Sequence, residues 1–95
     1  MEIRKQISEI LSAKIKELTD FEIDPQVSVS PDLAKGDLTS NVALRLGGKM
    51  GSPMEAGEKI IKKLNEDTQF LSSFRKIELV APGFINFWLS DEAID

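Results

Sequence analysis

The chain has 95 residues, 41% hydrophobic and 29% charged, a size and composition typical of one soluble domain with a single hydrophobic core. It contains neither cysteine nor histidine, which excludes disulfides, thiolate or imidazole metal sites and Cys-His or Ser-His-Asp catalysis, so we expect no independent enzyme and no cofactor in this chain. The net charge of -4 has the wrong sign for a domain that coats nucleic acid, so any RNA contact is expected to be local.

The first expected element is an amphipathic helix from about residue 2 to residue 18. Acidic residues are interspersed among the basic ones in this segment, and it has no unbroken apolar run, so it is neither a signal peptide nor a membrane span. We expect a cytoplasmic protein that contacts no membrane and no DNA. The apolar positions recur at steps of three and four residues, as on one face of a helix: Ile3, Ile7, Ile10, Leu11, Ile15 and Leu18.

A short strand and a loop are expected next. Residues 26–30 alternate polar and apolar side chains, which is typical of a strand, and Pro31 would end it. The loop that follows has Gly36 as its flexible point. Asp32 and Asp37 suggest a metal site, but two isolated carboxylates fall short of one, and we interpret Asp37 as a helix cap.

Two helices are predicted in the middle of the chain. The apolar pattern of residues 38–46 indicates the first, and the glycines of residues 47–51 close it. The second begins at Ser52-Pro53, where Ser52 and Glu55 fit a capping box. Three residues are candidate caps of the first helix: Asp37, Thr39 and Ser40. Three residues form the buried stripe of the second: Ile60, Ile61 and Leu64.

Two motifs in this region have both a functional and a structural interpretation, and we favour the structural one for each. Residues 47–52 contain glycines and a lysine, but they lack the spacing of a phosphate loop and follow a helix instead of a strand, which favours a linker. Asn41 is either a buried amide that satisfies nearby backbone groups or a group displayed to a ligand.

In the last third of the chain the pattern predicts a connector followed by a hairpin. Residues 65–73 form the connector, or a short helical turn packed by its aromatics, and the strands cover residues 75–80 and 84–89. A two-residue loop between the strands would mix polar and apolar residues on both faces. A three-residue loop, with Gly83 left-handed, instead gathers four apolar residues on one face, which we predict is the core face: Ile77, Leu79, Ile85 and Phe87.

The opposite face of this hairpin is the candidate functional surface. The rings of Phe84 and Trp88 flank the amide of Asn86, and such rings can stack on an unpaired base while an amide reads a base edge. Packing against another domain would equally explain the aromatics. The face comprises six residues: Lys76, Glu78, Val80, Phe84, Asn86 and Trp88.

The predicted order is helix, strand, helix, helix, strand, strand. It defines one α+β domain over residues 1–95, with a small, mainly antiparallel sheet of three or four strands and helices packed on one face.

Three segments, taken together, resemble the N-terminal domain of the arginyl-tRNA synthetases, which are class I aminoacyl-tRNA synthetases. They are GDLTSNVAL at residues 36–44, Ser52-Pro53 opening a helix, and APGFINF at residues 81–87. The resemblance covers essentially the whole chain and is densest at residues 36–46 and 77–90.

The resemblance implies an appended domain that does no chemistry, docks on the tRNA elbow and contacts the D loop. In similar proteins an aromatic residue and an amide residue two positions later approach a D-loop base, and the matching residues here are Phe84 and Asn86. Trp88 lies on the same predicted face. Arg75 and Lys76 are expected to add phosphate contacts.

The resemblance also implies a longer parent protein. Without histidine the chain cannot hold the family's HIGH-type ATP-binding signature, so we expect an N-terminal fragment that lacks the catalytic and anticodon-binding domains. The parent would join arginine to its tRNA using ATP and magnesium, and its catalytic domain would be a partner of this one. The alternative hypothesis is a protein-interaction or interdomain packing module without RNA contact; an autonomous acid/base enzyme has no paired carboxylates to support it.

Overall fold

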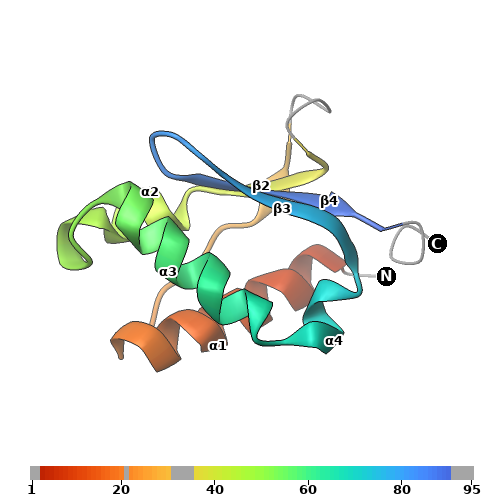
Figure 1. Ribbon diagram of the computed structural model, residues 1–95, viewed down its shortest axis with the longest axis horizontal. Helices are drawn as coiled ribbons and strands as arrows, with labels where there is room; N and C mark the ends of the chain where they lie inside the picture. Colours follow the sequence, from red (N-terminus) through yellow and green to blue (C-terminus); the bar gives the residue numbers. More distant parts are fainter. Residues whose placement is uncertain (1–2, 21, 31–35, 91–95) are drawn as a thin grey trace.

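The computed structural model describes residues 3–20, 22–30 and 36–90. Helices gather along one face of a small sheet, as Figure 1 shows. No helix in the described ranges is both long enough and apolar enough to cross a membrane. The elements, in chain order, are α1 (Ile3–Thr19), β1 (Ser28–Val29), β2 (Leu38–Ser40), α2 (Val42–Leu46), the 3-10 helix η2 (Gly47–Lys49), α3 (Pro53–Asn65), α4 (Thr68–Leu71), β3 (Phe74–Val80) and β4 (Phe84–Leu89).

In the described part of the chain the sheet has four strands, all antiparallel, in the order β1-β2-β4-β3. The α+β class and the antiparallel sheet are therefore confirmed. The strand β2 was not predicted, because residues 38–40 were expected to begin a helix. They instead pair with β4, from Leu38 opposite Phe87 to Ser40 opposite Ile85. Three residues are too few for periodicity to reveal a strand, and the pairing partner lies far away in the sequence.

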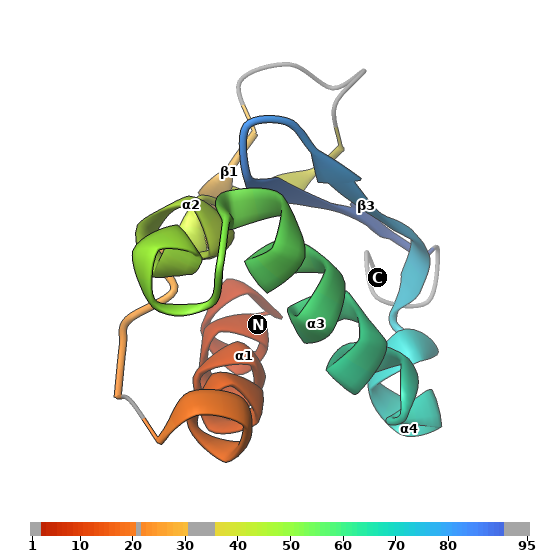
Figure 2. The same cartoon turned by 60° about the vertical axis from the view of Figure 1, so that its left-hand side comes forward.

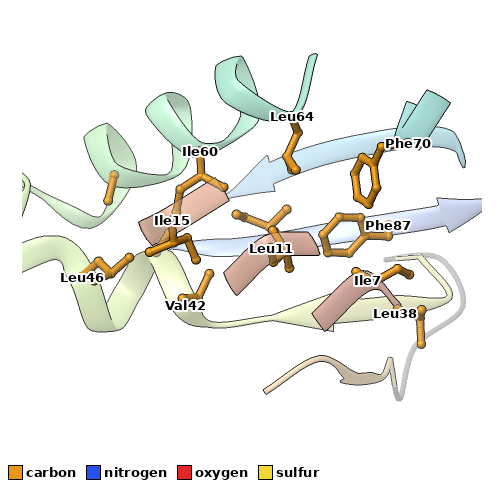
Figure 3. Close-up of a cluster of buried hydrophobic side chains, with 13 residues drawn as sticks. Ile7, Leu11, Ile15, Leu38, Val42, Leu46, Ile60, Leu64, Phe70 and Phe87 are labelled. Atoms are coloured by element: carbon orange, nitrogen blue, oxygen red, sulfur yellow. The ribbon is translucent and has the colours of Figure 1, made fainter. Parts of the chain in front are cut away.

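The hydrophobic core lies between the sheet and the helices α1 and α3, which run side by side beneath it (Figures 2 and 3). The stripe predicted for α1 is confirmed for Ile7, Ile10, Leu11 and Ile15, but Leu18 is 38% exposed near the end of the helix, and the side chain of Ile3 lies outside the described part. The Lys63 ammonium of α3 lies 3.1 Å from the Glu17 carboxylate of α1. Burial of these side chains provides most of the driving force for folding. The completely buried core residues include Leu11, Ile15, Val42, Ile60, Leu64, Ile85 and Phe87.

The strand β1 is shorter than the predicted residues 26–30. Gln26 has a φ of 52°, a left-handed conformation that does not continue a strand. Its backbone N–H donates to Asp24 Oδ1 at 2.9 Å, which closes a turn just before β1. The predicted end of this strand at Pro31 and the candidate metal ligand Asp32 lie outside the described residues.

At the starts of α2 and α3, serine hydroxyls accept hydrogen bonds from backbone N–H groups of the first turn. Of the predicted caps of α2, Ser40 bonds to the first turn, since its Oγ accepts from the N–H of Val42 at 3.2 Å. At the start of α3, Ser52 Oγ accepts from the N–H of Glu55 at 3.1 Å, which confirms the predicted cap. The expected linker between the two helices is confirmed as the short helix η2 and a turn.

The interpretation of Asp37 as a helix cap is wrong. Its carboxylate Oδ2 accepts from the N–H of Leu89 at 2.9 Å, and its own N–H donates to the carbonyl of Phe87 at 2.8 Å. The preceding Gly36 has a φ of +105°, and a Cβ there would lie 3.0 Å from the Phe87 carbonyl oxygen. The Gly-Asp pair therefore anchors the start of β2 on the backbone of β4.

Replacing Asp37 with alanine is expected to lower the free energy of unfolding by about 1–2 kcal/mol, because the N–H of Leu89 loses a charged acceptor. Urea unfolding at neutral pH measures this difference. Asp37→Asn, which keeps an acceptor oxygen, should fall between wild type and Asp37→Ala. The exposed Glu58→Ala in α3 serves as the control; equal effects of the two alanine variants would contradict the anchoring role.

The hairpin register is confirmed, but its loop differs from the prediction. Val80 pairs with Phe84, as a three-residue loop requires. Gly83 is not left-handed: the glycines with positive φ in the described part of the chain are Gly36 and Gly51, and the Ala81-Pro82 bond is cis. Gly83 instead allows close packing on α2, since its carbonyl accepts from the N–H of Leu44 at 3.2 Å and a Cβ would lie 3.0 Å from that nitrogen.

The predicted connector contains the short helix α4. Asp67 caps it, with Oδ1 accepting from the N–H of Phe70 at 3.0 Å, and the Lys14 ammonium lies 3.6 Å from Oδ2. The ring of Phe70 packs against Phe74 at a centroid distance of 4.8 Å, so the aromatics pack this segment as expected. The hydrogen bond from Phe70 and, less strongly, the charge of Lys14 lower the pKa of Asp67.

The lowered pKa of Asp67 predicts a loss of stability in acid. A carboxyl whose pKa is depressed in the folded state stabilises the fold above its unfolded pKa, and that stabilisation is lost as the pH falls through the folded pKa. Asp67→Asn, which keeps the cap but carries no charge, should therefore have a lower urea midpoint than wild type at pH about 6, and the difference should shrink as the pH falls below about 4, the ordinary pKa of an aspartate. A difference that persists undiminished in acid would contradict this assignment.

Candidate nucleic-acid interface

The face of the sheet opposite the helices carries the candidate site. Among the described residues no helix packs on this face (Figure 1). The predicted division of the hairpin is confirmed, because Ile85 and Phe87 are completely buried in the core while their sequence neighbours alternate onto the other side. One cross-strand row runs over all four strands of this open face: Ser28, Thr39, Asn86 and Glu78.

Phe84 stands beside this row, at the start of β4, and is half-buried. Its ring borders a hollow of about 260 Å³. Hydroxyl and amide side chains from the neighbouring elements complete the hollow, so that one aromatic surface meets several groups able to form hydrogen bonds. The lining residues are Gln26, Ser28, Thr39, Asn41 and Phe84.

Asn86 lies on the open face as predicted, but it is less accessible than a displayed amide would be. It is only 4% exposed, and its Oδ1 accepts from Thr39 Oγ1 at 2.7 Å. No side-chain nitrogen or oxygen in the described ranges is buried without a partner. The amide Nδ2, which has no acceptor among the described residues, therefore reaches solvent. Asn86 can offer a ligand its N–H donors, while its oxygen already accepts one hydrogen bond from Thr39.

Trp88 and Lys76 occupy the other end of the open face. They are cross-strand partners, and the Lys76 ammonium lies 4.7 Å from the centroid of the Trp88 ring. The same ammonium lies 3.4 Å from the Glu78 carboxylate. The Lys76 ammonium thus contacts both the Trp88 ring and the Glu78 carboxylate, which limits the attraction of Lys76 for a phosphate.

Arg75 is not brought together with Phe84 and Asn86. The β3–β4 register shifts between Phe74 and Lys76, and Arg75 lies at this irregularity. It borders a different hollow, with Asn65 of α3 and Leu71 of α4. Arg75 was expected to add phosphate contacts together with Lys76, but only Lys76 has a cross-strand partner on the open face, and a bulge cannot be read from alternation.

Two residues that contribute to this face or to its border were not predicted: Thr39 and Arg45. Thr39 was a candidate helix cap, and its place beside Asn86 follows from the unpredicted strand β2. Arg45, on α2, is held at the rim: its Nε donates to Asn41 Oδ1 at 3.0 Å and its Nη2 to the carbonyl of Asp24 at 2.6 Å. The expectation that Asn41 is a buried amide satisfying backbone groups is wrong: it is half-buried, its Oδ1 accepts from the Arg45 side chain, and it lines the hollow.

The open face thus combines the aromatic ring of Phe84 with hydroxyl and amide groups that are held by hydrogen bonds. The cations Lys76 and Arg45 contact neighbouring acceptor groups. No group of three or more Asp or Glu residues in the described part of the chain could hold a metal ion. These features describe a small α+β domain with one sheet face left open by its helices.

Comparison with known proteins identifies the family. The family described as "Arginyl tRNA synthetase N terminal domain" matches residues 1–89. The arginine–tRNA ligases of Thermotoga petrophila and Thermotoga maritima are each 38% identical over 93 residues, or 97% of this chain and 16% of theirs. Arginine–tRNA ligase of Shewanella woodyi is 39% identical over 77 residues, or 80% of this chain and 13% of that protein.

A solved structure agrees with these relatives. Arginyl-tRNA synthetase from Plasmodium falciparum superposes with a TM-score of 0.81 and 26% identity, over 97% of this chain and 17% of that one. The chain belongs to the arginyl-tRNA synthetase N-terminal domain family, which confirms the resemblance seen in the sequence. It spans about one sixth of the length of the Thermotoga relatives.

Proposed function

We propose that this chain is the tRNA-binding N-terminal domain of an arginine–tRNA ligase, which docks on the tRNA elbow and contacts the D loop. The observation that carries the proposal is the position of Phe84, an aromatic ring at the border of a polar hollow on the helix-free face of the sheet. An unpaired base stacks on such a ring, and Asn86 donates a hydrogen bond to its edge. Trp88 extends the same face beyond Asn86.

The charges of this face favour binding by stacking over binding by phosphate attraction. The chain has a net charge of -4, and Lys76 is paired with Glu78. Base–aromatic stacking contributes about 1–3 kcal/mol per base and needs no net positive charge. We therefore expect weak binding with a modest salt dependence, and Lys76 and Arg75 at most supplement it.

The parent protein in this proposal attaches arginine to its tRNA in the cytoplasm. Its ATP and magnesium would be bound outside residues 1–95, and its catalytic domain would be the second partner of this domain. The support is the family membership together with the small share, 16%, that the chain occupies in the Thermotoga ligases.

A titration of the isotope-labelled chain with unmodified arginine tRNA transcript tests the proposal by NMR. We expect shifts of backbone amides centred on residues 84–88, weaker at moderate salt than at low salt. An anticodon stem-loop, which lacks the D loop, is the matched RNA control and should leave these amides unchanged. Absence of shifts with the full tRNA would contradict direct RNA recognition and favour an interdomain contact for the aromatic face.

A further inference from the structure

The guanidinium of Arg45 is held in one orientation at the border of the open face by two uncharged acceptors. Its Nε donates to Asn41 Oδ1 at 3.0 Å, and its Nη2 donates to the carbonyl of Asp24 at 2.6 Å. The two acceptors come from separate parts of the chain, one directly before α2 and the other in the segment before β1. Because these bonds fix the planar group in advance, Arg45 has little side-chain entropy left to lose when it binds a ligand.

These bonds leave the positive charge of Arg45 uncompensated. Among the described residues no carboxylate forms an ion pair with Arg45. The side chain of Asp24 accepts instead from the N–H of Gln26, at 2.9 Å. Lys76 differs in this respect, since its ammonium lies 3.4 Å from the Glu78 carboxylate. Arg45 is therefore better suited than Lys76 to attract an anion.

The guanidinium also keeps N–H donors for a ligand. An arginine side chain has five N–H groups, and the two bonds use one on Nε and one on Nη2. Both N–H groups of Nη1 and the second one of Nη2 have no acceptor in the described part of the chain, and the residue is exposed. Donors on two adjacent nitrogens match two oxygens of a phosphate group, which they bind in a bidentate manner.

The two acceptors of Arg45 place it beside the hollow that Phe84 borders. Asn41 lines this hollow, and so does Gln26, whose backbone is bonded to Asp24. In a nucleotide the phosphate lies at the far side of the sugar from the base. An RNA strand that contacts the hollow with a base therefore carries its backbone past the border of the hollow, where Arg45 lies.

We infer that Arg45 binds a backbone phosphate of the tRNA, as a guanidinium that Asn41 and the Asp24 carbonyl orient before the RNA arrives. This inference rests on the proposed function, because the phosphate belongs to the RNA strand that the open face contacts. It adds a phosphate site on α2 to that face. Such a contact positions the strand without reading its sequence, and one fixed cation provides it locally in a chain whose net charge is -4.

Three variants of the chain test this phosphate contact. Arg45→Gln removes the charge and the paired donors, and Arg45→Lys keeps the charge but cannot bond to both acceptors at once. Lys59→Gln, at an exposed position of α3, removes the same charge from the helical layer and is the matched control. Affinities for arginine tRNA transcript are measured at several salt concentrations. The same tRNA is also assembled with a neutral methylphosphonate in place of one D-loop phosphate at a time, and thermal unfolding checks that each variant is folded.

Arg45→Gln should bind the tRNA about tenfold more weakly than wild type at low salt, because a charge-assisted bidentate contact is lost. Its plot of log affinity against log salt concentration should be less steep by about 0.7–0.9, the contribution of one phosphate contact. Lys59→Gln should stay within about twofold of wild type and keep its slope. Arg45→Lys should keep most of the slope but bind roughly threefold more weakly than wild type. One methylphosphonate should weaken wild type about tenfold and leave Arg45→Gln unchanged.

Equal losses in Arg45→Gln and Lys59→Gln would overturn the inference, and so would a methylphosphonate that weakens wild type and Arg45→Gln alike. In both cases wild type still binds the tRNA, so the proposed function stands. Wild-type affinity in Arg45→Lys would contradict the oriented, bidentate contact. If wild type binds no tRNA, the inference and the proposed function fail together.

Discussion

Replacing Phe84 with alanine is expected to weaken tRNA binding roughly 5- to 150-fold, which is the equivalent of about 1–3 kcal/mol for one lost base–aromatic stack. Phe84 borders the hollow on the open face and is only half-buried, so the fold should tolerate the change. Fluorescence anisotropy with labelled tRNA transcript at low salt measures the affinity, and footprinting of the D loop shows where protection is lost.

Two further variants at the same position separate stacking from simple apolar contact. Phe84→Leu keeps apolar volume but has no π-face, so it should bind nearly as poorly as Phe84→Ala. Phe84→Trp should retain binding. Leu18→Ala removes another apolar side chain at the surface, 38% exposed, from the helical layer and is the control for nonspecific effects. Unchanged tRNA affinity in Phe84→Ala, with a fold as stable as wild type, would exclude the stacking role.

Replacing Phe87 with alanine should produce the largest loss of stability, about 3–5 kcal/mol in the free energy of unfolding. Phe87 is completely buried in β4 (Figure 3), and its ring lies 5.4 Å from that of Phe74. The lost ring removes apolar burial and leaves a cavity between the sheet and the helices. Since a domain of this size has a total stability of about 5–14 kcal/mol, the variant should be marginally folded.

Equilibrium unfolding in urea, followed by circular dichroism, measures this loss. Phe87→Leu, which refills part of the cavity, should be intermediate. Val29→Ala, at a side chain that is 64% exposed, should change the free energy of unfolding by less than about 0.5 kcal/mol. A loss below about 1 kcal/mol for Phe87→Ala would mean that β4 is not the centre of the core.

Two of the three segments that carried the family resemblance are neighbours in the structure. Residues 36–41 supply β2 and its anchors, and residues 81–87 supply the hairpin loop and most of β4. The Gly36-Asp37 pair holds β2 on the backbone of β4, while Thr39 contacts Asn86. Much of the resemblance therefore reflects how the open face is built.

The sequence by itself determined the elements in which apolar side chains recur regularly over a long continuous segment. The stripe of α1, the Ser52 cap of α3, the β3–β4 register and the core position of Phe87 follow from side-chain spacing, because each involves residues that are near neighbours in the chain. The choice of Phe84 as a surface aromatic follows from the same alternation.

Only the tertiary structure decided the features that depend on pairing between distant residues. The strand β2 exists because residues 38–40 pair with β4, more than 40 positions away in the sequence. No pattern within residues 38–40 indicates that pairing. Because of the same pairing, Asp37 bonds to the backbone of β4 instead of capping a helix. Thr39 contacts Asn86, and the Asn86 amide, which alternation alone would place at the surface, is buried. Burial and hydrogen-bond partners are set by what packs opposite a residue, whereas periodicity reports only the direction in which its side chain leaves the backbone.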